Sequence, residues 1–157
     1  MLEIERKFLM HGYPIGLELI REVEIEQAYI SITPEVRIHR ATDMSTGKTD
    51  FRLTVKSDGE LTRTEIKTDV KESFFYDSVD LLGVNTILKE LKEYKLGQWV
   101  LEVCHVDPGT PNEFFYAEIE FPTELDAKTF IPPKYLGREI TFNEDYKMKN
   151  YWKRTRL

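Results

Sequence analysis

The first half of the chain alternates between apolar and polar residues, which is the pattern of β-strands. Residues 2–9, "LEIERKFL", put Leu2, Ile4 and Phe8 on one face and Glu3, Glu5 and Lys7 on the other, because successive side chains of a strand point to opposite faces. Similar alternation predicts further strands at residues 25–32, 35–41, 51–56, 61–70, 99–106 and 114–121. Turn signals separate them, including a hairpin at 57–60 and a break at Thr33-Pro34.

The pattern changes its period in the middle of the chain. Residues 77–94, "DSVDLLGVNTILKELKEY", carry apolar residues at near-helical spacing and predict a helix that Gly83 interrupts or bends. A short helix is predicted within residues 122–131, with Thr123 as its N-cap, and the basic tail at 143–157 is predicted to be partly helical. The chain is therefore predicted to be an α+β protein of antiparallel strands with a few attached helices.

Composition narrows the class of protein without naming it. The 157 residues are predicted to form a single domain, residues 1–157. The net charge of -6 argues against general nucleic-acid binding, which usually needs a basic surface. No apolar run is long enough to span a membrane, and the acidic start is unlike a signal peptide. We therefore expect a cytoplasmic protein, with Cys104 as a small buried side chain.

The charged strand faces carry both signs, and two interpretations fit them. The acids are Glu3, Glu5, Glu65, Glu102, Glu118 and Glu120, and the bases are Lys7, Arg37, Arg52, Lys56, Arg63 and Lys67, with His39 among them. Alternation alone favours outer faces turned to water around an apolar core, since antiparallel sheets usually expose one face. The alternative is a closed sheet with the charges in its lumen.

A charged lumen has a definite chemistry. Buried charges are costly unless they are paired or meet a ligand, and Lys and Arg side chains are suited to phosphate oxygens. Carboxylates bind hard cations such as Mg²⁺ or Mn²⁺, and the two E-x-E pairs, Glu3/Glu5 and Glu118/Glu120, suit one or two such ions. The second interpretation therefore predicts a polyanion and a divalent metal.

The order of motifs resembles that of a known family. "EIERKFL" resembles the N-terminal E-x-E-x-K signature of the CYTH superfamily, the triphosphate tunnel metalloenzymes, and "EVRIHR", "LTVKSDGELTRTE", "FYAEIEF" and "AKTFIPPKYLGREIT" resemble its later motifs. The resemblance implies an eight-stranded antiparallel β-barrel that forms a tunnel with peripheral helices. It also implies a metal-dependent enzyme that acts on a triphosphate-containing small molecule.

The resemblance assigns roles by position. The implied metal ligands are Glu3, Glu5, Glu118 and Glu120, for Mg²⁺ or Mn²⁺. The implied substrate-binding residues are Lys7, Arg37, His39, Arg52, Lys56, Arg63 and Lys67. The implied catalytic residues are Glu5, Lys7 and Glu65.

The sequence also departs from the family at several positions. His39 stands where the family usually has an arginine, Lys67 where a second acid often occurs, and Glu102 where an aspartate is usual. The K-x-R pair expected near residues 91–99 is unclear, with Lys92 and Lys95 as candidates. At the C-terminus the candidates are Asp145, Lys147 and Lys149, and surface positions are the simpler interpretation for the first two.

The expected activity is metal-dependent hydrolysis of inorganic triphosphate or a nucleoside triphosphate. The alternatives are a polyphosphate- or nucleotide-binding module without turnover, favoured by the weaker C-terminal motifs, and an adenylate cyclase of the class IV type. A homodimer is compatible with the sequence, and no membrane partner is expected.

Overall fold

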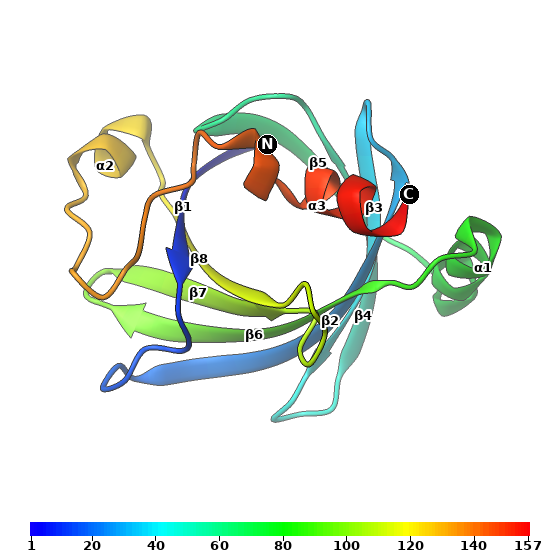
Figure 1. Cartoon of the computed structure of the whole chain (residues 1–157), viewed down its shortest axis with the longest axis horizontal. Helices are drawn as coiled ribbons and strands as arrows, with labels where there is room; N and C mark the ends of the chain where they lie inside the picture. Colours follow the sequence, from blue (N-terminus) through cyan, green and yellow to red (C-terminus); the bar gives the residue numbers. More distant parts are fainter.

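The structure, a computed structural model, describes all residues 1–157 and is built around a closed barrel of eight antiparallel strands (Figure 1). The strands are β1 (Leu2–Met10), β2 (Leu19–Ser31), β3 (Glu35–Asp43), β4 (Thr49–Lys56), β5 (Thr62–Asp69), β6 (Ile87–Leu96), β7 (Trp99–Val106) and β8 (Phe114–Glu120). Their order around the barrel is β1-β5-β4-β3-β2-β6-β7-β8. This arrangement confirms the predicted eight-stranded α+β barrel.

The helices are peripheral. They are α1 (Glu72–Leu82), α2 (Glu124–Thr129), the 3-10 turn η1 (Glu144–Tyr146) and α3 (Met148–Arg156). Thr123 caps α2 as predicted, since its side-chain oxygen accepts a hydrogen bond from the Asp126 backbone N–H. No helix of the protein is both long enough and apolar enough to cross a membrane.

The helix predicted over residues 77–94 is confirmed as far as Leu82, and Gly83 interrupts it as predicted, but the part predicted beyond Gly83 is wrong. Helix α1 ends at Leu82, where Gly83 takes a left-handed conformation with φ of 68° and donates its N–H to the Val79 carbonyl. Residues 87–96 form β6 instead. Ile87 and Leu91 are four residues apart, and this spacing fits one face of a helix and also one face of a strand. The glycine therefore ends the helix outright, which the apolar spacing concealed.

The apolar strand faces point outward and are covered by the connecting segments. One cluster packs Ile4, Phe8, Leu101, Val103 and Ile119 beneath α2 and the segment that follows it. Arg6 fastens this segment to β1 through an ion pair with Glu139 at 2.7 Å. Because the outer faces supply this core, the alternating charged residues are left in the lumen.

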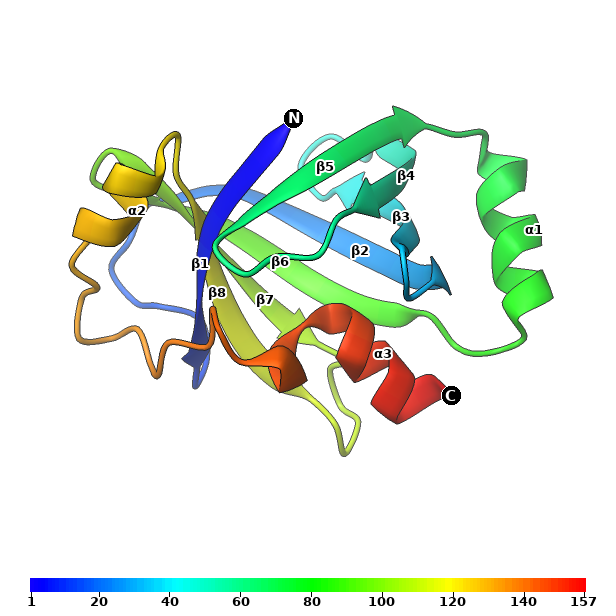
Figure 2. The same cartoon turned by 90° about the horizontal axis from the view of Figure 1, so that it is seen from above.

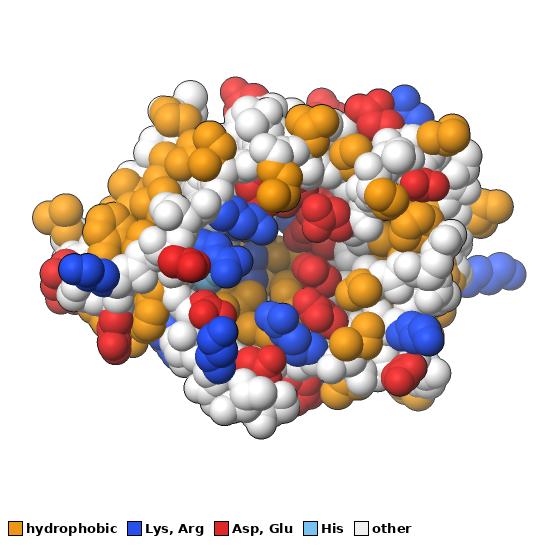
Figure 3. Space-filling model, turned by 180° about the vertical axis from the view of Figure 1, so that it is seen from behind, with side chains coloured by type: hydrophobic (Ala, Val, Ile, Leu, Met, Phe, Trp, Pro, Cys, Tyr) orange, Lys and Arg blue, Asp and Glu red, His pale blue; other side chains and the backbone are white.

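The two ends of the barrel are unlike each other. Helix α3 lies across one end, as Figures 1 and 2 both show. There Trp152 packs on Tyr29 of β2, with ring centroids 5.9 Å apart. The opposite face is hollowed, and Figure 3 shows Lys and Arg side chains gathered at one side of the hollow, Asp and Glu side chains gathered at the other, and both kinds mixed along its lower rim. Acids and bases therefore gather on different sides of the hollow without being fully separated.

Candidate functional site: a charged tunnel

The lumen holds a cavity of about 220 Å³ that all eight strands and the C-terminal segment line. Its charged lining residues are Glu3, Glu5, Lys7, Glu35, Arg37, His39, Lys56, Glu60, Arg63, Glu65, Lys67, Lys89, Glu102, Glu118, Glu120 and Lys147. Most of the predicted site residues are therefore brought together, facing inward, and the interpretation of the charged faces as water-exposed is wrong.

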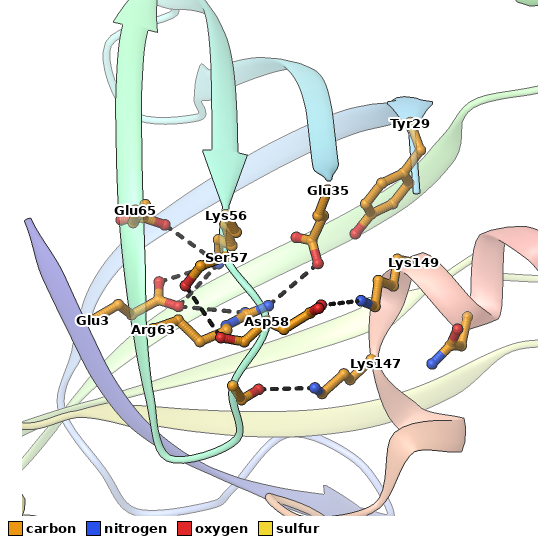
Figure 4. A network of polar contacts seen from close by, with 12 residues as sticks. Glu3, Tyr29, Glu35, Lys56, Ser57, Asp58, Arg63, Glu65, Lys147 and Lys149 are labelled. Carbon is orange, nitrogen blue, oxygen red and sulfur yellow. Dashed lines mark hydrogen bonds and ion pairs between the residues drawn. The ribbon is translucent and has the colours of Figure 1, made fainter. Parts of the chain in front are cut away.

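One side of the tunnel, which we call the paired sector, consists of Glu3, Glu35, Lys56, Arg63 and Glu65 (Figure 4). The Lys56 ammonium lies 3.0 Å from Glu3 and 3.3 Å from Glu65. The Arg63 guanidinium lies 3.2 Å from Glu35 and 3.4 Å from Glu3. Each cation in this sector bridges at least two carboxylates, so its buried charges are compensated within the protein.

The position of Arg63 depends on the β4–β5 hairpin. Gly59 has a φ of +147°, and a Cβ at this position would lie 2.4 Å from the Thr62 carbonyl oxygen. Only glycine fits such a turn without rearrangement. The Lys147 ammonium donates to the Gly59 carbonyl at 2.8 Å, and Lys149 pairs with Asp58 at 3.2 Å. The predicted hairpin is thereby joined to the start of α3 (Figure 4).

A second side, which we call the acidic wall, consists of Glu5, Glu102, Glu118 and Glu120 on β1, β7 and β8. Glu5 stands directly opposite Glu120 in the strand register, and Glu102 opposite Glu118. Like charges at opposed positions of neighbouring strands repel each other. A wall of this kind requires protons or cations to offset it.

The pKa values along the acidic wall show this repulsion. Burial and the neighbouring Glu118 and Glu93 raise the pKa of Glu102 to about 7. Burial and the adjacent Glu118 raise the pKa of Glu5 well above its usual range. Burial would also raise the pKa of Glu118, but the hydrogen bond from Glu5 and the nearby Lys7 lower it instead. The wall therefore favours the uptake of positive charge.

The acidic wall fits a hard divalent cation by its chemistry. Its donors are all carboxylate oxygens, which suit Mg²⁺ or Mn²⁺. No three acidic, histidine or cysteine side chains converge as a ready-made metal site in this conformation. Side-chain rotation would therefore have to accompany metal binding.

A third group, which we call the open cations, consists of Lys7, Arg37 and Lys89, none of which lies within 4.0 Å of a carboxylate. The Lys7 ammonium donates to the Tyr146 carbonyl at 2.8 Å and lies 4.2 Å from the centre of the Tyr116 ring. The Arg37 Nε is buried without a hydrogen-bond partner. Burial and the nearby Arg37 lower the pKa of Lys89 to about 8. Carboxylates act on Lys7 and Arg37 only from a distance, without a direct ion pair, so these cations would gain from a bound anion.

Several predicted residues lie outside this arrangement. Arg52 does not line the cavity and pairs with the exposed Asp69 at 3.4 Å. Lys92 lies on the outer surface, 3.4 Å from Glu22, and Lys95 and Asp145 are exposed. Lys147, for which a surface position was the simpler interpretation, lines the cavity instead.

Three charged lining residues, Glu35, Glu60 and Lys89, escaped sequence reasoning. Lys89 was placed within the predicted helix, and reading residues 87–96 with a strand period would have put it on the face of Ile87 and Leu91. Glu35 begins β3, two residues before Arg37, and alternation placed it on that face. Its role as a partner for Arg63 depends on the register of β3, β4 and β5, which brings the two side chains together across Lys56 and which alternation alone does not specify. Cys104 is buried as predicted, but it faces the tunnel.

A closed barrel whose lumen separates acids from unpaired bases is the architecture of a tunnel for a metal and a polyanion. An inorganic triphosphatase from Nitrosomonas europaea is 31% identical to this chain over 153 residues, covering 95% of both proteins. The chain therefore belongs to the CYTH superfamily of triphosphate tunnel metalloenzymes, in the same family as that protein.

Solved structures agree with this assignment. The crystal structure of the inorganic triphosphatase NE1496 is 28% identical, with a TM-score of 0.60 over 95% of this chain and 93% of that one. A protein from Pyrococcus horikoshii OT3, PH1819, is 18% identical, with a TM-score of 0.59 over 79% of this chain and 80% of that one, and it shares the fold. No protein-family model matches the sequence.

Proposed function

We propose that this protein hydrolyses a triphosphate, with inorganic triphosphate as the first candidate substrate, in a reaction that requires Mg²⁺ or Mn²⁺. The observation that supports this most strongly is the set of open cations, which lie in a buried lumen without a direct carboxylate partner. A polyphosphate chain would neutralise them with several closely spaced charges. The related protein named inorganic triphosphatase points to the same substrate class.

The metal would be held by carboxylates of β1 and β8, namely Glu3, Glu5, Glu118 and Glu120. When bound, it would neutralise phosphate oxygens and lower the pKa of an attacking water. Glu102, opposite Glu118 in the register, extends this donor set. The raised pKa values of Glu5 and Glu102 imply that metal binding releases protons from the wall.

The cations would bind and orient the phosphate chain. We assign phosphate contacts to Lys7, Arg37, His39, Lys56, Arg63 and Lys67, and add Lys89 to this set. Arg52, at the tunnel mouth, would attract the anionic substrate electrostatically without contacting it. Glu65, which lies 3.3 Å from Lys56 and 3.1 Å from Lys67, would be a positioning residue for both. Phosphoryl transfer depends chiefly on such placement and on charge neutralisation.

The test is phosphate release from inorganic triphosphate and from ATP, with Mg²⁺ or Mn²⁺, over a pH series. We expect release that depends on the metal. Glu5→Gln should reduce kcat by at least about a hundredfold, because it removes the negative charge of a proposed metal ligand. Lys92→Ala, on the outer surface, serves as the matched control and should leave the rate unchanged.

The opposite outcomes are equally definite. Folded protein that releases no phosphate with either metal would contradict the proposal. Tight triphosphate binding without product would favour the binding module, and cyclic AMP from ATP would favour the cyclase. A homodimer remains a prediction, which analytical ultracentrifugation would test.

A further inference from the structure

His39 lies on β3 with its side chain in the tunnel, surrounded by cations from four strands. In the strand register it faces Arg52 of β4 on one side and the neutral Gln27 of β2 on the other. Arg37 of β3, Lys67 of β5 and Lys89 of β6 act on the same ring. His39 is therefore the one histidine placed among the proposed phosphate-binding residues.

The acids near this cluster pair with its other members and not with His39. Lys67 pairs with Glu65 at 3.1 Å, and Arg52 pairs with Asp69 at 3.4 Å. The Gln27 amide donates to the Tyr29 hydroxyl at 3.3 Å. No carboxylate lies within 4.0 Å of the His39 ring, so the imidazole has no counter-ion of its own in the free protein.

This environment keeps the free imidazole neutral. Burial and the adjacent cations Arg37, Arg52, Lys89 and Lys67 lower the pKa of His39 to about 3. A triphosphate chain brings several negative charges to the same place, and these offset the repulsion that excludes the proton. The net electrostatic potential at the His39 ring, set by the cations and the bound anion together, would then favour protonation.

We propose that His39 and the cations around it form a phosphate subsite in which His39 takes up one proton when the polyanion binds. The inference rests on the proposed function, because it takes a triphosphate as the occupant of the tunnel. The proton comes from the solvent and forms an N–H bond at the unprotonated ring nitrogen. No bond of the substrate changes in this step, and the new N–H can donate to a phosphate oxygen.

Such a subsite makes triphosphate affinity depend on pH in a way that an arginine would not. Between the pKa values of the free and bound states, uptake of one proton lowers the affinity by up to about tenfold for each unit of rising pH. An arginine stays charged throughout this range. His39 thus makes the affinity for the substrate depend on pH, with the highest affinity in mildly acidic conditions.

The direct experiment is an NMR measurement of the imidazole nitrogens. The chain has only three histidines, His11, His39 and His105, and the loss of one signal set in His39→Gln assigns the ring. We expect that non-hydrolysable imidotriphosphate with Mg²⁺, at pH 7, moves the His39 nitrogens from neutral to imidazolium shifts. His11 and His105 should not move, and they serve as internal controls.

A second measurement compares the affinity of the wild type with that of His39→Arg across pH 5.5 to 8, with the same ligand. Protonation of the ligand itself affects both proteins equally, so it cancels in the ratio. The ratio of wild-type to variant affinity should fall with rising pH, by up to about tenfold per unit, while the ratio for His39→Gln against His39→Arg stays constant.

The outcomes separate the two proposals. Ligand binding with a His39 ring that stays neutral, or a wild-type ratio that is flat across the series, would overturn the inference and leave triphosphate binding intact. The absence of any ligand binding to folded protein would overturn both.

Discussion

The paired sector and the open cations lie in the same tunnel and are buried to a similar extent, but they differ in how their charge is compensated. In the paired sector, Lys56 and Arg63 each contact two or more carboxylates (Figure 4). Lys89 and Arg37 contact none. The first arrangement is complete without a ligand, whereas the second carries a cost that only an anion can offset. We therefore expect the paired sector to contribute to stability as well as to ligand binding, and the open cations to contribute to binding alone.

The largest expected effect comes from breaking the paired sector. Lys56→Ala would remove the cation that Glu3 and Glu65 share. Arg63 stays 3.4 Å from Glu3 and Lys67 stays 3.1 Å from Glu65, so the free energy of unfolding should fall by about 3 kcal/mol, the lower end of the cost of breaking a buried ion pair. Urea unfolding followed by tryptophan fluorescence measures this. Lys95→Ala removes the same charge from an exposed position of β6 and is the matched control. Equal, small effects of the two changes would show that the pairing contributes nothing to stability.

In the acidic wall, part of the negative charge is neutralised by protons bound to the carboxylates and not by neighbouring cations. Because the pKa of Glu102 is raised to about 7 from its usual 4.5, the folded protein holds this proton more tightly than the unfolded chain. The resulting stability is fully present below about pH 4.5 and is lost as the pH rises through 7. The loss at Glu102 amounts to about 3 kcal/mol at most.

Glu102→Gln isolates this contribution. The glutamine cannot ionise, so the variant should gain stability relative to the wild type as the pH rises from 4.5 to 7.5. Urea unfolding of both proteins at several pH values gives the difference directly, and contributions from all other groups cancel to first order. A difference that stays constant with pH would mean that Glu102 titrates alike in the folded and unfolded states.

A smaller effect, of opposite sign for stability and for binding, is expected among the open cations. Lys89→Met removes a buried ammonium that has no carboxylate partner, so the free energy of unfolding should be unchanged or rise by about 1 kcal/mol. The affinity for triphosphate should fall by about 10–100-fold, because a charge-assisted contact contributes about 1.5–3 kcal/mol. Calorimetric titration and urea unfolding on the same sample measure both quantities.

The contradictory result is a loss of stability together with unchanged affinity. Lys89 would then contribute to stability and not to binding, and the distinction between the paired sector and the open cations would fail for this residue of β6. Lys7→Met, which changes the member of this group on β1, would show whether that failure is confined to β6.

The sequence predicted most of the strands because they alternate so regularly, whereas the closed barrel was implied by the family resemblance. Glu3 and Lys7 lie on the face that alternation assigns them, and the hairpin at 57–60 follows from its Asp-Gly pair. What alternation does not determine is which face turns inward, because that depends on closure between β1 and β8, which are far apart in the chain. The family resemblance supplied that information.

The failures have physical causes as well. Lys89 was missed because a four-residue apolar spacing is common to helix and strand. Arg52 shares the inward face of β4 but stands at the mouth, where Asp69 reaches it. Strand periodicity gives the face of a residue and not its depth, so it could not separate Arg52 from Lys56.

The smallest expected effect tests the outer surface against the lumen. Lys92, on the outward face of β6, lies 3.4 Å from Glu22 and 4.2 Å from the centre of the Tyr13 ring. Exposed ion pairs contribute less than about 1 kcal/mol, so Lys92→Ala should change the free energy of unfolding by no more than that and leave triphosphate affinity unaltered. Lys89 is three residues away on the same strand. Its replacement is expected to leave the free energy of unfolding unchanged or slightly higher and to weaken triphosphate binding. If Lys92→Ala weakened triphosphate binding as much as Lys89→Met does, the general field of the protein, and not the inward placement of particular cations, would govern how the tunnel holds its ligand.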